Sequence, residues 1–248
     1  MFGRWAVGAS AAVVLSLLAQ PVLAQIPGTK LPSGAVVPDI TGIWERSPDQ
    51  GIRFDPSGAA PPLTPAYAAK LQADLAARAK GEDVADPTAG CLPPGMPRMM
   101  SATYPLEVLQ TRGQVTIIAE WDSTVRRIFT DGRSHPSDDD LDVTFNGHSI
   151  GHWEAGVLVV DTVGLHGDTS FEASPLRHSD QMHLVERIRL LDPKTLEDQI
   201  TVIDPVALTR PWIVVRRYVR GGPGARIMEY VCEENNHDSG PGSAPAKP

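Results

Sequence analysis

The residues best suited to chemistry are a glutamate and several histidines in the second half of the chain. Along the segment 182–191, the even positions are apolar except for Glu186. Because side chains alternate between the two faces of a strand, this row should point inward and carry Glu186 with it. A carboxyl group buried away from water favours its protonated form, which suits general acid or base work. The structural alternative is that Glu186 pairs with an inward-facing arginine, and the sequence leaves both possibilities open.

Six of the seven histidines lie within the stretch 135–183. His148 and His152 are four residues apart in a predicted strand and should share a face, and His178 precedes the Glu186 strand. If His148 or His178 reaches Glu186, the two groups form an acid–base pair of the kind that isomerases and lyases use. We therefore predict that Glu186, His178 and His148 are catalytic. The histidines lack the spacing of a known zinc motif, so we predict neither a metal nor a cofactor.

Other polar and aromatic residues could bind a substrate beside these groups. Asp161 is a lone carboxylate on a row of three valines, and Asp198 lies in a similar row of the strand 195–203. Arginines could pair with these carboxylates or bind a ligand, and aromatic side chains could fill the core or line a cavity. The predicted substrate-binding residues are Tyr104, Arg127, Trp153, Asp161 and Arg216.

The elements that must position these residues are mostly short strands. Strand patterns separated by turn residues cover 39–45, 106–111, 114–122, 124–131, 148–154, 157–163, 182–191, 195–203, 212–220 and 226–233. Hairpin-connected strands favour an all-β fold, an antiparallel up-and-down barrel of about ten strands, because closure removes exposed edges. A two-sheet sandwich is the alternative. The clearest helix signal starts with Thr64 and Pro65 and stops at Gly81.

Two resemblances accompany this pattern. The tripeptide Gly42-Ile43-Trp44, followed by up-and-down strands, resembles the calycin (lipocalin-like) superfamily, in which a Gly-x-Trp on the first strand closes one barrel end. Longer segments resemble an abundant family of exported bacterial proteins: DGRSHP, FNGHSIGHWEAGVLVVDTVGL, RHSDQMHLVERIRLLDPKTLE, DPVALTRPW and EYVCEENN. The second resemblance covers most of the chain. Together they imply a barrel and export, and no particular chemistry.

The first 24 residues predict the compartment. Arg4 precedes the apolar run Trp5–Leu18, and Val22-Leu23-Ala24 forms a small-residue cleavage site. This pattern is typical of a secretory signal peptide, with a retained anchor as the alternative. We expect a periplasmic or secreted protein with an N-terminal extension (25–105) that holds one strand and the helix, a barrel (106–238) and a disordered tail (239–248).

Charge and cysteine content limit the partners. The formal net charge of −8 argues against nucleic acid and anionic lipid as partners, and no membrane insertion is expected. The two cysteines, Cys91 and Cys232, should form one disulfide in an oxidising compartment, and two free thiols are the alternative. The oligomeric state cannot be read from the sequence.

These observations lead to a functional expectation. We expect a cofactor-independent lyase or isomerase that acts on a small hydrophobic or aromatic molecule in a barrel cavity by general acid–base catalysis. Breakdown of lignin-type aromatic compounds with loss of a one-carbon fragment is an example of such chemistry. A non-catalytic, lipocalin-like carrier of a small hydrophobic ligand is the alternative, and a structural protein of the cell envelope is the third possibility.

Overall fold

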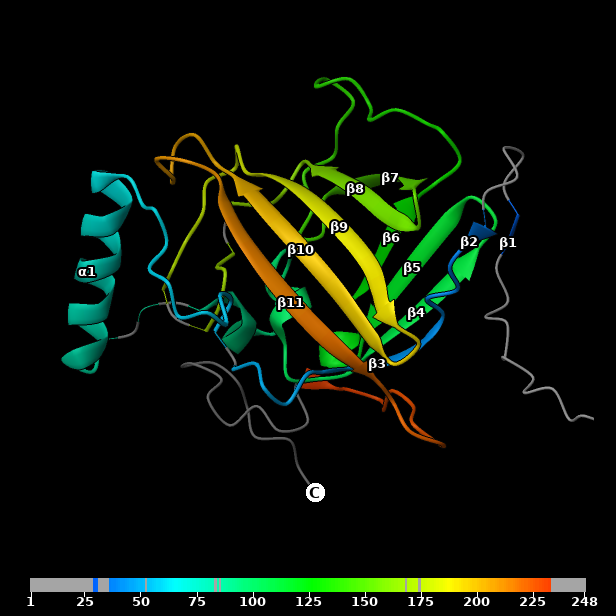
Figure 1. Cartoon of the computed structure of the whole chain (residues 1–248). Helices are drawn as coiled ribbons and strands as arrows, with labels where there is room; N and C mark the ends of the chain where they lie inside the picture. Colours follow the sequence, from blue (N-terminus) through cyan, green and yellow to red (C-terminus); the bar gives the residue numbers. More distant parts are fainter. Residues whose placement is uncertain are drawn as a thin grey trace, which may run out of the picture.

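Nine strands of the described chain close into a barrel (Figure 1). The computed structural model describes residues 29–30, 36–51, 53–82, 84, 86–167, 169–173 and 175–232. The predicted signal peptide and the predicted tail lie outside these residues. The barrel strands are β3 (Gly42–Arg46), β4 (Leu106–Thr111), β5 (Gln114–Ala119), β6 (Val125–Phe129), β7 (His148–Glu154), β8 (Val157–Val163), β9 (His183–Asp192), β10 (Thr195–Ile203) and β11 (Trp212–Arg220). A separate two-stranded sheet joins β1 (Thr29–Lys30) and β2 (Val36–Val37).

The strand order confirms the predicted barrel with one difference. Around the barrel the order is β10-β11-β3-β4-β5-β6-β7-β8-β9. Neighbours pair antiparallel, except that β6 and β7 pair parallel through only two residue pairs, Ile128 with Ser149 and Phe129 with Ile150. A long connection, residues 130–147, separates these two strands and projects beyond the barrel wall (Figure 1). This parallel junction is the place where the up-and-down pattern is interrupted.

The predicted strand 226–233 does not form. Residues 225–231 are irregular, and β11 already has β10 on one side and β3 on the other. No free edge of the barrel remains for another strand to join. The segment packs instead beside Trp121, where Met228 N donates to Glu120 Oε2 at 2.7 Å and Tyr230 meets the ring of Tyr104 edge-on.

The first barrel strand comes from the N-terminal segment. Trp44 on β3 is fully buried and donates from Nε1 to Ile40 O at 2.9 Å. The guanidinium of Arg220 from β11 lies 4.3 Å above the Trp44 ring and donates to Thr41 O. Gly42 has a φ of 137°, which residues with a side chain rarely adopt, and this explains why the residue two before the tryptophan is glycine. The barrel thus begins at residue 42 and not at 106.

The N-terminal segment also supplies the predicted helix and short turns. Helix α1 (Pro65–Ala79) begins with proline as predicted and stands beside the barrel (Figure 1), touching the core through Tyr67 and Leu71. The 3-10 turns are η1 (Pro87–Gly90), η2 (Arg98–Ser101) and η3 (Trp121–Ser123), and all of η2 is buried. None of the helices in the described part of the chain is long and apolar enough to cross a membrane.

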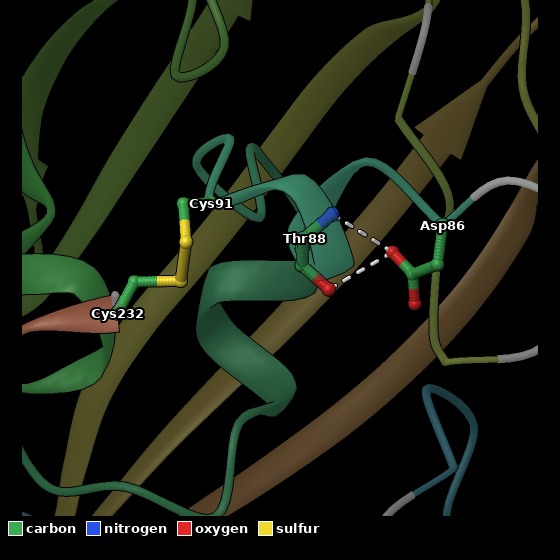
Figure 2. The surroundings of a disulfide bond; sticks show 4 residues. All are labelled: Asp86, Thr88, Cys91 and Cys232. Carbon is green, nitrogen blue, oxygen red and sulfur yellow. Dashed lines mark hydrogen bonds between the residues drawn. A yellow bond between two sulfur atoms is a disulfide. The ribbon is translucent and has the colours of Figure 1, made fainter. Parts of the chain in front are cut away.

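The two cysteines form the predicted disulfide. Cys91 and Cys232 are 141 residues apart in the sequence, and their Cα atoms are 5.7 Å apart (Figure 2). Beside the bond, Asp86 Oδ1 accepts hydrogen bonds from Thr88 N and Thr88 Oγ1 at 3.1 and 2.9 Å (Figure 2), and these bonds shape η1. Arg98 clamps the same carboxylate through both of its terminal nitrogens. The disulfide therefore joins the irregular 225–232 segment to the anchored turn before β4.

Candidate functional site

Glu186 lies inside the barrel, as the alternation of β9 predicts, but its partner is an arginine. The side chain is fully buried, and Arg126 from β6 donates to both carboxylate oxygens, with 2.9 Å between Nη1 and Oε1. Arg126 is itself held by Ser149 Oγ at 3.2 Å and Thr162 Oγ1 at 3.0 Å. A two-pronged guanidinium–carboxylate pair braced by hydroxyls is the structural alternative that the sequence left open. Neither His148 nor His178 is among the hydrogen-bond partners of Glu186.

Two more charged groups share this interior. Asp198 on β10 is fully buried near Glu186, and no cation among the described residues is hydrogen-bonded to its carboxylate oxygens. Burial, followed by the charge of Glu186, raises the pKa of Asp198 well above its usual value. Arg216 on β11 donates to the backbone oxygens of Arg53 and Ser101, and burial lowers its pKa. The predicted binding residue Arg216 thus ties a loop and η2 to the barrel wall.

The outer face of the same strands carries a second polar cluster. Inward positions of β8 are Leu158, Val160 and Thr162, so Asp161 and the valines in its row point outward. His148 on β7 and His183 on β9 also take outward positions, next to buried Ser149 and Leu184. The grouping of side chains by face is as predicted. The row that contains Asp161 is the outer one.

Asp161 is the centre of a hydrogen-bonded chain of imidazoles. Its Oδ1 is 2.9 Å from His135 Nε2, and its Oδ2 is 2.9 Å from His183 Nε2. His135 Nδ1 lies 2.8 Å from His148 Nδ1, and the two rings meet edge-on with centroids 5.0 Å apart. Asp161, His135 and His148 therefore form a continuous relay, and His183 is a side branch on the same carboxylate.

The relay fixes the tautomer of its last member. A carboxylate only accepts, so His135 must donate to Asp161 from Nε2. A neutral His135 then has a lone pair on Nδ1, and His148 must donate to it from its own Nδ1. We assign the lone pair of His148 to Nε2, which makes no hydrogen bond to any described residue. Burial, followed by the proximity of His135 and Arg133, lowers the pKa of His148. His148 is therefore a neutral base at neutral pH.

His148 lines a cleft of about 500 Å³ at the point where β6 and β7 separate. We call it the β6–β7 cleft. Arg127, Phe129 and Asn146 line it with His148, and its remaining lining residues are Pro93, Asp122, Ser123, Thr124, Val125, Arg126, Thr144, Phe145, Gly147 and Ser149. Arg127, a predicted binding residue, is exposed and has no ionic partner among the described residues. The volume falls in the range of small-molecule sites.

The turn at one edge of this cleft is conformationally strained. Asp122 and Ser123 are successive non-glycine residues with positive φ values of 56° and 46°. Such backbone is costly for residues with a side chain and gathers at functional sites. Burial raises the pKa of Asp122, whereas the pKa of His148 in the same cleft is lowered. Burial is the first cause of both shifts, so both groups are partly shielded from water.

A second depression lies on the outer face of β7, β8 and β9. This outer groove has a volume of about 520 Å³ and an apolar floor of Ile150, Val159 and Val185. Its other lining residues are Gly132, Arg133, His135, Gly151, His152 and Asp161. His135 and Asp161 therefore border the outer groove, while His148 at the end of the relay borders the β6–β7 cleft.

His178 belongs to a different, buried cluster. Its Nε2 lies 2.5 Å from Thr169 Oγ1, and its Nδ1 lies 2.9 Å from the backbone oxygen of Ser179. The hydroxyl of Ser179 donates to Asp204, which also accepts three backbone N–H groups. Burial lowers the pKa of His178. These bonds secure the loop before β9 and do not reach Glu186 or His148.

The two predicted aromatic binding residues lie away from both depressions. Tyr104 packs with Trp121, with ring centroids 6.1 Å apart, and Trp153 is partly buried against the core.

Two residues of the site, His135 and Asp122, were not predicted from the sequence. His135 lies in the DGRSHP segment of the 130–147 connection, where no periodicity indicates which strand it will meet.

The described residues contain no group of three or more His, Cys, Asp or Glu side chains placed to hold a metal ion. The nitrogens of His135 are already engaged by Asp161 and His148.

Comparisons with protein-family models, with curated proteins and with solved structures found no match to this chain.

Proposed function

We propose that the protein is an enzyme that transfers protons on a small hydrophobic or aromatic molecule bound in the β6–β7 cleft. The relay from Asp161 through His135 to His148 is the observation that supports it. His148 is the general base. Asp161 stabilises the positive charge that His148 gains, because His135 passes the effect along two short hydrogen bonds.

The reaction class is a lyase or an isomerase. His148 Nε2 takes the proton of a C–H bond, and that electron pair forms a carbon–carbon double bond or an enolate. In a lyase the leaving group departs with its own bonding electrons and takes the proton back from His148. In an isomerase the proton returns to a different carbon. Both need a positioned base, a positioned acid and restricted water access.

The compartment is part of the same proposal. The disulfide supports an oxidising environment. Export to the periplasm or beyond, guided by a cleaved N-terminal signal, would place the protein where cytosolic ATP and nicotinamide cofactors are absent. Proton transfer without a cofactor suits that setting.

Hydrogen–deuterium exchange tests the proposal even while the product is unidentified. A panel of small acids, ketones, alcohols and aromatic compounds is incubated with the protein in D₂O, and loss of C–H signals is followed by proton NMR. We expect exchange on at least one compound and a loss of about 100-fold or more in His148→Ala, the range for a general base. His152→Ala is the matched control, since His152 lies on the same face of β7 without a hydrogen bond to the relay, and it should exchange within about twofold of wild type. An absence of exchange, or equal rates in His148→Ala, overturns the proposal.

A ligand carrier is the second candidate. The apolar floor of the outer groove favours it, because three aliphatic side chains form a surface for a hydrophobic ligand. A carrier would bind such compounds without exchanging their protons. Binding lost in Val159→Asp and kept in His148→Ala, with no exchange in either protein, would favour the carrier.

A further inference from the structure

The cleft beside His148 contains polar groups that lack partners, and these groups indicate what it binds. Arg127 and His148 each come one residue before the first pair of the parallel ladder, Ile128 with Ser149. Both point outward at the same end of the parallel ladder between β6 and β7. The unpaired guanidinium of Arg127 therefore borders the cleft on the same side of the wall as the base. A guanidinium offers two parallel N–H donors that match a carboxylate.

Two further atoms in the lining have unfilled hydrogen-bonding capacity. Thr124 is 5% exposed, and its Oγ1 has no partner among the described residues. Asn146 donates from Nδ2 to Val125 O at 3.1 Å, and this bond fixes its amide, while its Oδ1 is buried without a described partner. Buried polar atoms are normally satisfied by protein, water or ligand. Both atoms are closed to solvent, so the exposed groups of the cleft are the ones that can recognise a ligand.

The cleft also has an apolar side. Phe129 and Phe145 line it; the guanidinium of Arg133 stacks 3.9 Å from the Phe129 ring centroid, and the Phe129 and His148 ring centroids are 5.5 Å apart. Arg126, the other cation in the lining, is already neutralised by Glu186 inside the barrel. Arg127 is thus the cation available to a ligand, in a protein whose overall charge is negative.

We propose that the ligand of the β6–β7 cleft is a small organic acid with an apolar body, with its carboxylate on Arg127 and its body on the Phe129 side of the cleft. This inference rests on the proposed function, because it names the substrate class of the same cleft. A carboxylate held by a cation acidifies the neighbouring C–H bond, and that proton is the one His148 would remove.

Binding of two related probes tests the inference. Phenylacetate and 2-phenylethanol share a phenyl ring; the first has a carboxylate and the second has no charge. Calorimetry on the full mature chain should rank phenylacetate above 2-phenylethanol, with the carboxylate worth about tenfold in affinity. Arg127→Ala should remove this preference, and Arg127→Lys should restore part of it.

Controls separate the possible failures. Arg187→Ala removes an exposed arginine outside the cleft and should leave both affinities unchanged. His148→Ala should still bind phenylacetate, because His148 is assigned to proton removal and not to the carboxylate. If 2-phenylethanol binds as well as phenylacetate, if Arg127→Ala keeps the acid preference, or if no probe binds at millimolar concentration, the inference is wrong. If the probes rank as expected and no proton exchange is found with any acid, the inference stands and the proposed function fails.

Discussion

The two faces of the same barrel strands carry acid–base groups that do different work. On β7, Ser149 points inward and braces Arg126, while its neighbour His148 points outward and ends the relay. On β8, Thr162 and Asp161 divide in the same way. Inside, the charged groups are sealed from solvent and Glu186 is paired with Arg126, whereas the groups outside border open clefts. A titratable group becomes useful for chemistry where a ligand can reach it, and burial alone does not supply that access.

The largest effect is expected on the free energy of unfolding, for substitutions in the inner ion pair of Arg126 and Glu186. Arg126→Met leaves Glu186 and Asp198 buried without their cation, and breaking a buried pair in this way typically costs about 3–5 kcal/mol. Glu186→Gln should also destabilise the fold, because it leaves Arg126 uncompensated. Urea unfolding measures both. His135→Ala on the outer face should change the unfolding free energy by less than about 1 kcal/mol. A Glu186→Gln protein that melts like wild type and loses all proton exchange would reverse the comparison and make Glu186 the catalytic group.

The next effect lies on the outer face. Asp161→Asn keeps the shape of the relay and removes its negative charge, so His148 should hold a proton less well. We expect exchange to slow by about 10-fold or more, together with a shift of the acidic limb of its pH profile to lower pH. The pH dependence of the exchange rate measures both quantities. Asp138→Asn, on the exposed part of the 130–147 connection, is the control. If the exchange rate falls but the acidic limb of the pH profile does not move, Asp161 acts by holding His135 and the 130–147 connection in place and not through its charge.

The pH dependence of stability gives the smallest effect. The pKa of Asp198 is raised in the folded state from a usual value of 3.8, so the folded chain binds more protons than the unfolded chain. Its contribution to stability is fully present below about pH 4 and is lost as the pH rises through the folded-state value. Asp198→Asn should flatten this decline, which urea midpoints measured across the pH range can follow. An unchanged slope in the variant would assign the decline to another group.

Alternation along the strands predicted much of this arrangement. It placed Glu186 inside, His183 on the opposite face and Asp161 in a row of valines, because each of these depends only on the two-residue period of a strand. Alternation alone could not decide whether the row of side chains that contains Asp161 faces the interior of the barrel or its outer surface. The outer face of β7 to β9 is itself half-covered and rich in valine and isoleucine, so apolar content does not distinguish it from the interior.

Other parts of the site depend on contacts that no local pattern encodes. His135 reaches Asp161 from a loop that crosses between parallel strands, and the partner of Glu186 comes from β6, 60 residues earlier. Asp122 was hidden by a turn with positive φ at two non-glycine residues. The sequence names residues able to do chemistry, but the path of the 130–147 connection decides which of them meet.

The position of β3 has a consequence for how the chain acquires its structure. β3 lies between β11 and β4, so the first barrel strand to be synthesised pairs with the last one, across about 175 residues. The ring cannot close until residue 220 is available, and pairings of such long range fold slowly. During that interval β3 and β11 expose unpaired edges, which are open to association with other chains. Once β3 and β11 have paired, the bond between Cys91 and Cys232 can secure the segment that follows β11 against the turn before β4.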